Sequence, residues 1–338
     1  MERALSAGGH AIVARDLRRS FGSTQALRGV SLTVPAGTVL GVLGPNGAGK
    51  TTLIRILATL LPPDGGQALV AGHDVVGESF AVRSRIGLTG QYAALDEQLS
   101  GRENLRLIGR LYHLGERHAR RRADELLALV DLEEAAGRSV GTYSGGMRRR
   151  VDIAAGLVAA PTVLFLDEPT TGLDPRSRID VWNVIEGLVR EGTTLLLTTQ
   201  HLEEADRLAD SIAVMDAGLI IAEGTPEELK RQVGGDVLEL RLRDRSQATA
   251  AAAALQPLAA GAPRDEDEVL AVPLRAAEGA VVEAVRRLDA AGVGVIDLGV
   301  RRPTLDDVFL TLTGHEAEPE AGAGAAAGAA ALAEEHVA

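Results

Sequence analysis

The chain has 338 residues, of which 46% are hydrophobic, and a formal net charge of −12 at pH 7, so we expect two or three domains around sizeable cores. The acidic balance argues against nucleic-acid binding, and the absence of cysteine excludes disulfides and thiolate metal sites. The longest apolar stretch, residues 153–166, is interrupted by Pro161 and is shorter than the ~20 residues of a membrane-spanning helix, so we expect no such helix.

The first predicted elements are two strands joined by a turn, within residues 12–32. Phe21, one of only four phenylalanines, stands in the turn and precedes the next strand. An aromatic ring at this place could stack on a nucleotide base, or it could be an ordinary packing residue. Both interpretations stay open at this point.

A glycine-rich loop follows the apolar run of residues 38–43 and opens a helical pattern of apolar residues. Its spacing satisfies G-x-x-x-x-G-K-[ST], the phosphate-binding P-loop, in the strand-loop-helix context that this motif requires. Lys50 is one of only two lysines in the chain and is expected to reach the β- and γ-phosphates, while the Thr51 hydroxyl ligates Mg²⁺. The predicted nucleotide-binding residues of the loop are Gly44, Pro45, Asn46, Gly47, Ala48, Gly49, Lys50, Thr51 and Thr52.

The next strand, predicted over residues 85–91, ends in the amide of Gln91, which carries little weight alone. A helical insertion then runs from about residue 96 to residue 161 within an otherwise α/β chain. Ser100 and Glu103 form a capping box before its first helix. The arginine runs 120–122 and 148–150 are interpreted as solvated helix faces.

A Ser-Gly-Gly sequence stands near the end of this insertion, before a helix predicted over residues 148–158. Its serine can cap that helix, and its glycines would let an anion approach backbone N–H groups. For the pentapeptide alone, a plain helix cap is the simpler interpretation. The residues concerned are Tyr143, Ser144, Gly145, Gly146 and Met147.

Two further strands are predicted to end in polar side chains. The first, residues 163–166, is followed by Asp167 and Glu168, and the second, residues 193–199, is followed closely by His201. Because α/β sheets place ligands at the carboxyl ends of their strands, we expect Asp167 to hold Mg²⁺ and Glu168 to accept a proton from an attacking water. His201 is a candidate contact of the γ-phosphate or of that water.

The pattern restarts at Val237, after a hairpin predicted within residues 211–222. Strands at 237–242, 269–274 and 293–300, with helices near Thr249 and at 280–288, predict a small α+β domain over residues 236–315. Thr304 and Asp307 form a capping box before a last helix. No catalytic constellation stands out in this domain, so interaction or regulation is the expected role, and the Ala/Gly-rich residues 316–338 are predicted to be disordered.

The P-loop, Gln91, the Ser-Gly-Gly sequence, Leu-Asp-Glu-Pro and His201 occur in this order, and together they resemble the ATP-binding subunits of ATP-binding-cassette (ABC) transporters over about residues 12–229. Tyr143 and Met147 replace the family's usual Leu and Gln. This variant, together with Arg-Arg-Pro-Thr-Leu-Asp-Asp-Val-Phe-Leu at residues 301–310, resembles the exporters of the daunorubicin/doxorubicin-resistance type. The fold class implied is α/β, a P-loop NTPase cassette with a mixed sheet core over residues 10–235, followed by the α+β domain.

The resemblance also implies roles for single residues. Phe21 would be the base-stacking aromatic, Gln91 would link Mg²⁺ to the membrane partner, and residues 143–147 would be the signature loop that contacts the ATP of a partner subunit. Glu168 would be the general base. The remaining implied roles are communication across the dimer for Leu173 and Asp174, and a switch role for His201.

The implied activity is hydrolysis of ATP with Mg²⁺ by a homodimer that lies, as a peripheral protein, at the cytoplasmic face of the cell membrane. It would drive efflux of a drug or antibiotic, anthracycline-like, through a separate polytopic permease. The alternatives are a soluble cassette ATPase without a transport role and an exporter ATPase for a lipid or polysaccharide. The single cassette and the acidic balance favour an exporter subunit over a soluble cassette ATPase and argue against a nucleic-acid partner.

Overall fold

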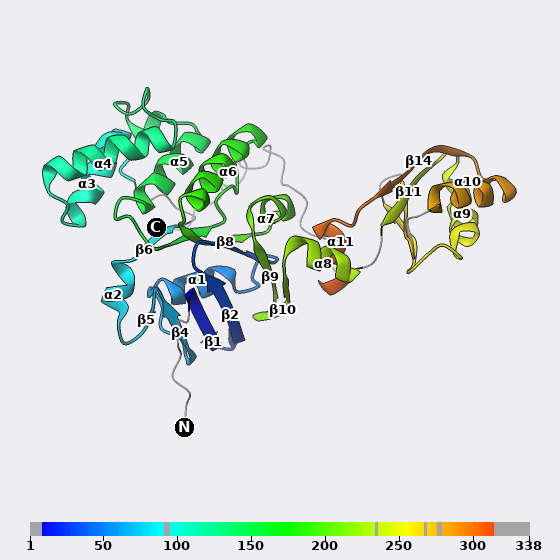
Figure 1. Ribbon diagram of the computed structural model, residues 1–338, viewed down its shortest axis with the longest axis horizontal. Coiled ribbons are helices and arrows are strands. Elements are labelled where there is room, and N and C mark those ends of the chain that lie inside the picture. The colour runs from blue at the N-terminus through cyan, green and yellow to red at the C-terminus, as the bar shows by residue number, and fades with distance from the viewer. Residues whose placement is uncertain (1–8, 91–94, 234–235, 267–268, 276–278, 314–338) are drawn as a thin grey trace, which may run out of the picture. The chain divides into compact units, whose positions relative to one another are not determined.

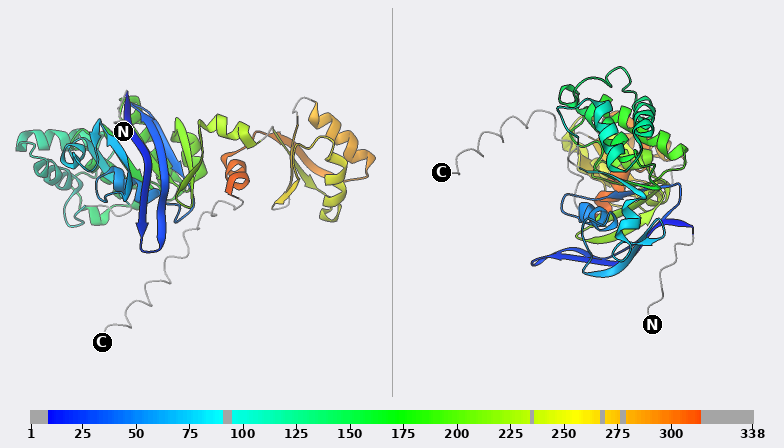
Figure 2. Two further views of the ribbon diagram at one scale, coloured as in Figure 1. Left: turned by 90° about the horizontal axis from the view of Figure 1, so that it is seen from below. Right: turned by 90° about the vertical axis from the view of Figure 1, so that its left-hand side faces the viewer.

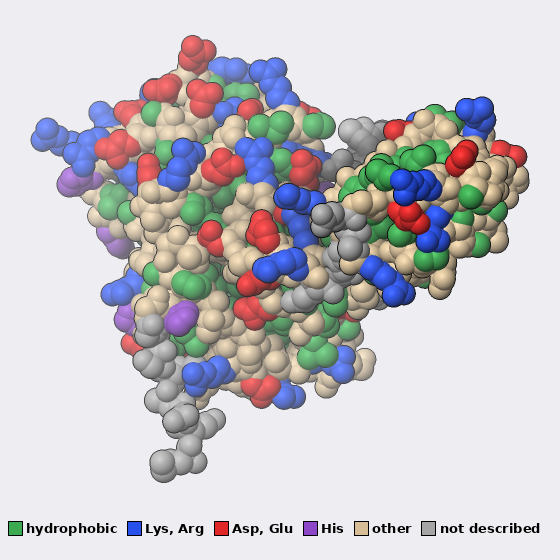
Figure 3. Space-filling model, turned by 45° about the vertical axis from the view of Figure 1, so that its right-hand side comes forward, with side chains coloured by type: hydrophobic (Ala, Val, Ile, Leu, Met, Phe, Trp, Pro, Cys, Tyr) green, Lys and Arg blue, Asp and Glu red, His purple; other side chains and the backbone are tan. Residues whose placement is uncertain are grey.

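The computed structural model describes residues 9–90, 95–233, 236–266, 269–275 and 279–313. Contacts between the described residues divide the chain after Glu223 into a cassette unit and a C-terminal unit (Figure 1). On the face drawn in Figure 3, acidic and basic side chains are intermingled across the surface.

A six-stranded sheet forms the centre of the cassette unit, in the order β10-β9-β3-β8-β7-β6. The strands from β9 to β6 in this order are parallel, and every residue of β3, β7 and β8 is buried, as expected for strands covered on both faces. The strands are β3 (Val39–Leu43), β6 (Ile86–Thr89), β7 (Val163–Asp167), β8 (Thr194–Thr199), β9 (Ser211–Asp216) and β10 (Leu219–Gly224).

A second, antiparallel sheet has the order β2-β1-β4-β5. Helix α1 (Lys50–Leu57) contacts β2 and β4 of this sheet and β7 of the parallel sheet, so its apolar residues join both into one core. The P-loop is thereby held between two sheets. The strands are β1 (His10–Phe21), β2 (Thr24–Pro35), β4 (Gly65–Val70) and β5 (His73–Asp74), and the short helix α2 (Ser79–Arg83) follows them.

The helical insertion lies at one end of the cassette unit and the antiparallel sheet at the opposite end (Figures 1 and 2). The predicted capping box is present: the Ser100 hydroxyl accepts from the backbone of Glu103, whose carboxylate accepts from the backbone of Ser100. Helices α5, α6 and α7 cover the parallel sheet on the face opposite to α1. The insertion comprises α3 (Gly101–Leu111), α4 (Glu116–Leu129), η1 (Val140–Thr142) and α5 (Gly145–Gly156), and α6 (Pro175–Arg190) and α7 (Leu202–Leu208) follow later in the chain.

The C-terminal unit contains an antiparallel sheet in the order β12-β13-β11-β14. Helices α9 and α10 contribute Leu255, Ala284 and Leu288 to one core with Leu240 and Val272 of the sheet. The elements are α8 (Pro226–Val233), β11 (Val237–Leu242), η2 (Arg245–Gln247), α9 (Ala248–Leu255), β12 (Arg264–Glu266), β13 (Val269–Pro273), α10 (Ala280–Ala290), β14 (Val295–Arg301) and α11 (Leu305–Thr313).

The division between the units differs from the expected boundary at 235/236. Helix α8 belongs by its contacts to the C-terminal unit, because it packs against α11. The sequence analysis included residues 226–233 in the cassette without predicting a helix, because the alternating strand pattern restarts only at Val237. The packing partner of α8 lies far along the chain. The expected tail, residues 316–338, lies outside the described residues.

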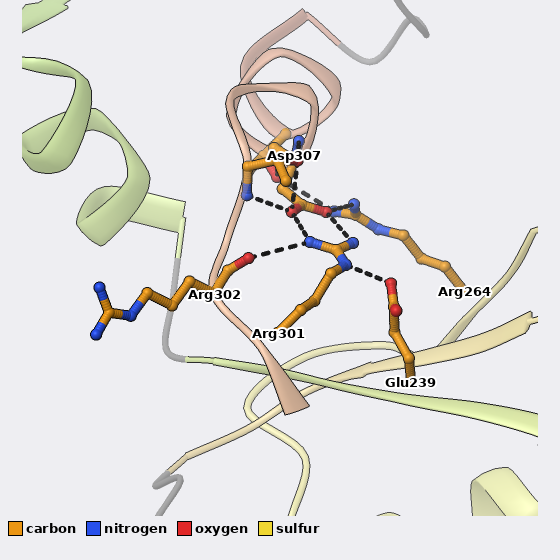
Figure 4. A network of polar contacts seen from close by, with 7 residues as sticks. Glu239, Arg264, Arg301, Arg302 and Asp307 are labelled. Carbon is orange, nitrogen blue, oxygen red and sulfur yellow. Dashed lines mark hydrogen bonds and ion pairs between the residues drawn. The ribbon is translucent and has the colours of Figure 1, made fainter. Parts of the chain in front are cut away.

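A network of charged side chains ties α11 to the sheet of the C-terminal unit (Figure 4). Arg301 donates from Nη1 to Asp307 Oδ2 (2.6 Å) and from Nη2 to Asp307 Oδ1 (3.2 Å), and it also bonds Glu239. The predicted capping box is present here too, since the Thr304 backbone donates to Asp307 Oδ2 at 2.8 Å. Burial acts to raise the pKa of Asp307, but the hydrogen bonds from Arg301 and Thr304 outweigh it, and the pKa is lowered.

Replacement of Arg301 by Met should destabilise the attachment of α11 by about 2–4 kcal/mol, because it removes the cation of Glu239 and the nearer of the two cations of Asp307, while Arg264 remains 3.4 Å from Asp307 Oδ1. Hydrogen exchange of the α11 backbone amides would measure the loss of protection. Since the folded pKa of Asp307 is lowered, its contribution is complete above the unfolded pKa of about 3.9 and is lost as the pH falls through the folded value. The difference between variant and wild type should therefore shrink below about pH 4.

The matched control is Arg302→Met, because the side chain of Arg302 points away from Asp307 in Figure 4. Equal protection of α11 in the Arg301 and Arg302 variants would show that Arg301 contributes nothing to this attachment.

Candidate nucleotide-binding site

An open cavity of about 680 Å³ lies where the P-loop meets the turn between β1 and β2. Its walls are residues 23–26, Arg28, residues 46–52, Glu168 and Ala217. The structure thus brings Glu168, which follows β7, to the P-loop residues from Asn46 to Thr52, as the sequence predicted. The size and the mixed polar lining suit a nucleotide.

The P-loop backbone follows conformations that favour glycine. Gly47 and Gly49 have φ values of +80° and +107°, in the left-handed region. At Gly49 an added Cβ would lie 2.5 Å from the Ala26 carbonyl oxygen, and at Gly44 it would lie 2.2 Å from that of Met215. The loop can therefore direct its N–H groups and the start of α1 toward the cavity, where an anion is favoured.

Lys50 is held at the cavity wall by backbone carbonyls. Its Nζ donates to the oxygens of Gly44 (2.7 Å) and Pro45 (3.0 Å), and it lies 3.5 Å from Glu168 Oε1. The Lys50 side chain is only 4% exposed, so its charge is poorly screened by water. These contacts place one cation beside the candidate base at the start of α1.

Two oxygen ligands suited to Mg²⁺ lie next to one another. Thr51 Oγ1 donates to Asp167 Oδ1 at 3.3 Å, and Thr198 Oγ1 donates to the same oxygen at 2.6 Å. Among the described residues no group of three or more His, Cys, Asp or Glu could hold a metal ion. One carboxylate and one hydroxyl fit Mg²⁺ that is bound together with phosphates and water. Gln91, the third predicted metal residue, lies outside the described residues.

Glu168 combines burial with an unusual backbone. Its side chain is 7% exposed, and its φ is +48°, in the left-handed region. Its backbone N–H donates to the Thr198 carbonyl at 3.0 Å, and Oε2 accepts from the Thr171 hydroxyl at 3.3 Å. These contacts fix a carboxylate at the edge of the cavity, where a general base must stand.

The Ser-Gly-Gly sequence packs against the loop that contains Leu173 and Asp174. Ser144 caps α5 as predicted, and Asp174 caps α6 by accepting from the Ser177 backbone at 3.0 Å. An added Cβ at Gly146 would lie 2.5 Å from Ser177 Oγ, so this glycine also allows the two helix starts to meet. The residues from Tyr143 to Met147 are not among those that line the cavity, and Tyr143 is itself buried.

Phe21 and His201 are not among the residues that line the cavity. Phe21 is half-exposed at the end of β1, where the Arg19 guanidinium lies 5.1 Å from the ring centroid. His201 occupies the N-cap position of α7 without a capping hydrogen bond from its side chain, and its backbone N–H donates to Thr199 Oγ1 at 2.9 Å. Their proposed roles toward base and phosphate stay predictions.

The interpretation of residues 148–150 as a solvated face is wrong for Arg149 and Arg150. Their side chains are 11% and 13% exposed and donate to backbone carbonyls of neighbouring elements. The sequence also missed Glu204, a fully buried carboxylate that accepts from Trp182 Nε1 at 3.1 Å and whose pKa burial raises. For Arg149, the sequence did offer one signal of its buried position. Asp152 stands three residues later, and this spacing lets the two side chains pair on one face of a helix.

A P-loop with Asp167 and Glu168 at the end of a nearby strand, in a sheet that carries a helical insertion, defines an ATP-binding cassette. The family model "ABC transporter" matches residues 27–171, and the model "ATP-binding protein DrrA1-3-like, C-terminal domain" matches residues 224–313. The chain belongs to the ABC transporter family, as an ATP-binding protein with the DrrA-like C-terminal domain. It is an ATPase.

Similarity to curated proteins extends over both units. The chain is 55% identical to the daunorubicin resistance ATP-binding protein DrrA3 of Streptomyces coeruleorubidus, over 93% of this chain and 99% of that protein. It is 51% identical to the daunorubicin/doxorubicin resistance ATP-binding protein DrrA of Streptomyces peucetius, over 91% and 94%. A solved dimeric cassette in a post-hydrolysis state, bound to ADP and Pi, matches with a TM-score of 0.58 and 25% identity, over 63% of this chain and 98% of that one.

Proposed function

We propose that this chain is the ATP-hydrolysing subunit of an exporter that removes anthracycline drugs similar to daunorubicin and doxorubicin. The observation that carries the proposal is the 55% identity to a daunorubicin resistance ATP-binding protein, which spans both the cassette and the C-terminal unit. The path for the drug is assigned to a separate polytopic permease, as the family resemblance implies. Among the described residues no helix is long and apolar enough to cross a membrane. We place the subunit at the cytoplasmic face of the membrane as a peripheral protein.

The working unit in this proposal is a homodimer with two shared ATP sites. Each ATP, with Mg²⁺ at Thr51 and Asp167, would lie between the P-loop of one subunit and Ser144, Gly145 and Gly146 of the other. The dimeric form of the matching solved cassette supports this arrangement. Because ATP would contact both subunits and ADP would not, ATP favours the closed dimer and hydrolysis releases it, which can drive a permease.

Within each site, the chain's own residues divide the work. Lys50 and the P-loop amides bind and orient the phosphates, and Glu168 takes a proton from the attacking water. Mg²⁺, when bound, neutralises charge that develops on the phosphate oxygens. Leu173 and Asp174 pack beside the signature loop and are proposed to report its position to the partner, while His201 acts as a switch near the γ-phosphate.

Drug accumulation in cells that express the chain with a polytopic partner tests this function. Wild type should lower intracellular daunorubicin, and the Glu168→Gln variant with the same partner should not. The chain should fractionate with membranes only when the partner is present. If accumulation is unchanged although the purified chain hydrolyses ATP, the drug assignment is wrong and the ATPase assignment stands.

A further inference from the structure

Arg149 extends from the first half of α5 toward the carboxyl ends of β6 and β7. Its side chain is 11% exposed, and Nε, Nη1 and Nη2 all donate hydrogen bonds. Three of its acceptors are backbone carbonyl oxygens, which belong to Gly90, Asp167 and Pro169. Few side chains other than arginine can reach several carbonyls at once with a planar set of donors.

One edge of this guanidinium, formed by Nε and Nη2, bonds the residues on either side of Glu168. Nη2 donates to the Asp167 carbonyl at 3.0 Å, and Nε donates to the Pro169 carbonyl at 2.8 Å. These are the carbonyls immediately before and after the Glu168 residue. The two bonds therefore fix the backbone on both sides of the proposed general base.

The backbone of Glu168 needs such support. Its φ of +48° is uncommon for a residue with a side chain, and the following proline favours an extended conformation at this position instead. Strain of this kind is costly and persists only where the surroundings hold it. The left-handed turn matters for chemistry, because Glu168 lines the cavity although it directly follows a fully buried strand.

The other edge of the guanidinium supplies the charge balance. Nη1 donates to Asp152 Oδ2 at 3.2 Å and to the Gly90 carbonyl at 2.6 Å, and Asp152 is itself 6% exposed. Burial lowers the pKa of Arg149, while the charges of Asp152, Glu204 and Asp167 oppose this effect. A buried cation with such partners can stay charged and keep all its donors in place.

We propose that Arg149 is a positioning residue for ATP hydrolysis, which maintains the left-handed turn at Glu168 and so aims the carboxylate into the cavity. It acts through Glu168 and lines no part of the cavity itself. The inference rests on the proposed role of Glu168 as general base. Arg149 lies on α5, the helix that follows the signature loop. It therefore links this loop, which would contact the ATP of the partner subunit, to Glu168, which would act on the ATP of its own subunit.

Substitution of Arg149 by Lys removes the planar set of donors and keeps the positive charge. The value of kcat should fall by about 10- to 100-fold, because a small misplacement of a reacting group is costly. The KM for ATP should change by less than about threefold, because the P-loop is untouched. If Arg149 only stabilised the fold, its replacement would lower the amount of active protein, and the effect would be the same whether or not Glu168 is present.

Arg150→Lys is the matched control. Arg150 follows Arg149 on α5, is 13% exposed, and donates to the carbonyls of Val130 (2.9 Å) and Asp131 (3.3 Å), which are not next to Glu168. Its kcat should stay within about twofold of wild type. In the Glu168→Gln background, Arg149→Lys should cause no further loss of the residual turnover, because the group that it positions is gone.

A second design guards against unfolding of the Lys variant. Joint replacement Arg149→Gln and Asp152→Asn removes both buried charges together, so neither is left unpaired. Circular dichroism and thermal unfolding would show that this protein is folded, and it should show the same loss of kcat, since a single amide cannot hold both carbonyls.

Three results would overturn the inference. One is a folded Arg149 variant of either design with kcat within about threefold of wild type. Another is a loss of kcat from Arg149→Lys that is as large in the Glu168→Gln background as in the wild-type background. The third is a Glu168→Gln protein that still hydrolyses ATP, and this result marks failure of the general-base assignment, whereas the first two leave that assignment standing.

Discussion

Replacement of Glu168 by Gln is expected to lower the rate of ATP hydrolysis by about 10²–10⁴-fold while ATP binding persists. The amide keeps the size of the side chain and can still approach Lys50 and Thr171, which lie 3.5 Å and 3.3 Å from the carboxylate oxygens. It cannot take a proton from water. The contacts expected to hold the nucleotide, from the P-loop and Asp167, are unchanged.

Phosphate release and size-exclusion chromatography test the two parts of this prediction. Steady-state phosphate release should be nearly abolished, and ATP, unlike ADP, should accumulate the protein as a closed dimer, because the step that opens it no longer occurs. Glu203→Gln, an exposed carboxylate on α7, is the control for loss of one negative charge. A Glu168→Gln protein with hydrolysis within about threefold of wild type would remove Glu168 from the role of base. An inactive protein that stays monomeric with ATP would leave the base in place and contradict the shared site.

The central elements of the cassette could be predicted from the sequence because their signals are local. The strands β3 and β7 are largely apolar runs and β8 is three leucines between threonines, and the structure places each within two residues of the expected bounds. The capping boxes at Ser100 and Thr304 are likewise contained in four consecutive residues. A glycine-rich loop between a buried strand and a helix leaves little choice of chemistry.

Features that depend on distant parts of the chain could not be predicted. Helix α8 was not recognised and belongs to the C-terminal unit, because its partner α11 stands about eighty positions later. Arg149 belongs to a run of three arginines that local reasoning assigns to the solvent, and only the fold shows the carbonyls that it reaches. The left-handed backbone of Glu168 could not be predicted either, because a residue that precedes proline is expected to be extended.

Replacement of Lys50 by Ala is expected to weaken both ATP binding and hydrolysis. The ammonium group that would face the β- and γ-phosphates is lost, and removal of a desolvated charged partner typically costs about 2–5 kcal/mol, or roughly 30- to 5,000-fold in Kd. The structure adds a second effect. Lys50 is buried and donates to the carbonyls of Gly44 and Pro45, so the variant should also lose about 1–3 kcal/mol of stability.

The two effects can be separated because only one of them concerns the nucleotide. Titration with ATP, at a temperature where circular dichroism shows that the Lys50→Ala protein is folded, measures the binding loss alone. Lys230→Ala, on α8 of the C-terminal unit, removes the other lysine of the chain and should leave the Kd unchanged. Equal ATP affinity of the folded Lys50→Ala protein and wild type would show that this ammonium does not contact the phosphates. A large rise in Kd for Lys50→Ala, with the Lys230 variant unaffected, would place the phosphates at the start of α1. Glu168 Oε1 lies 3.5 Å from Lys50 Nζ there.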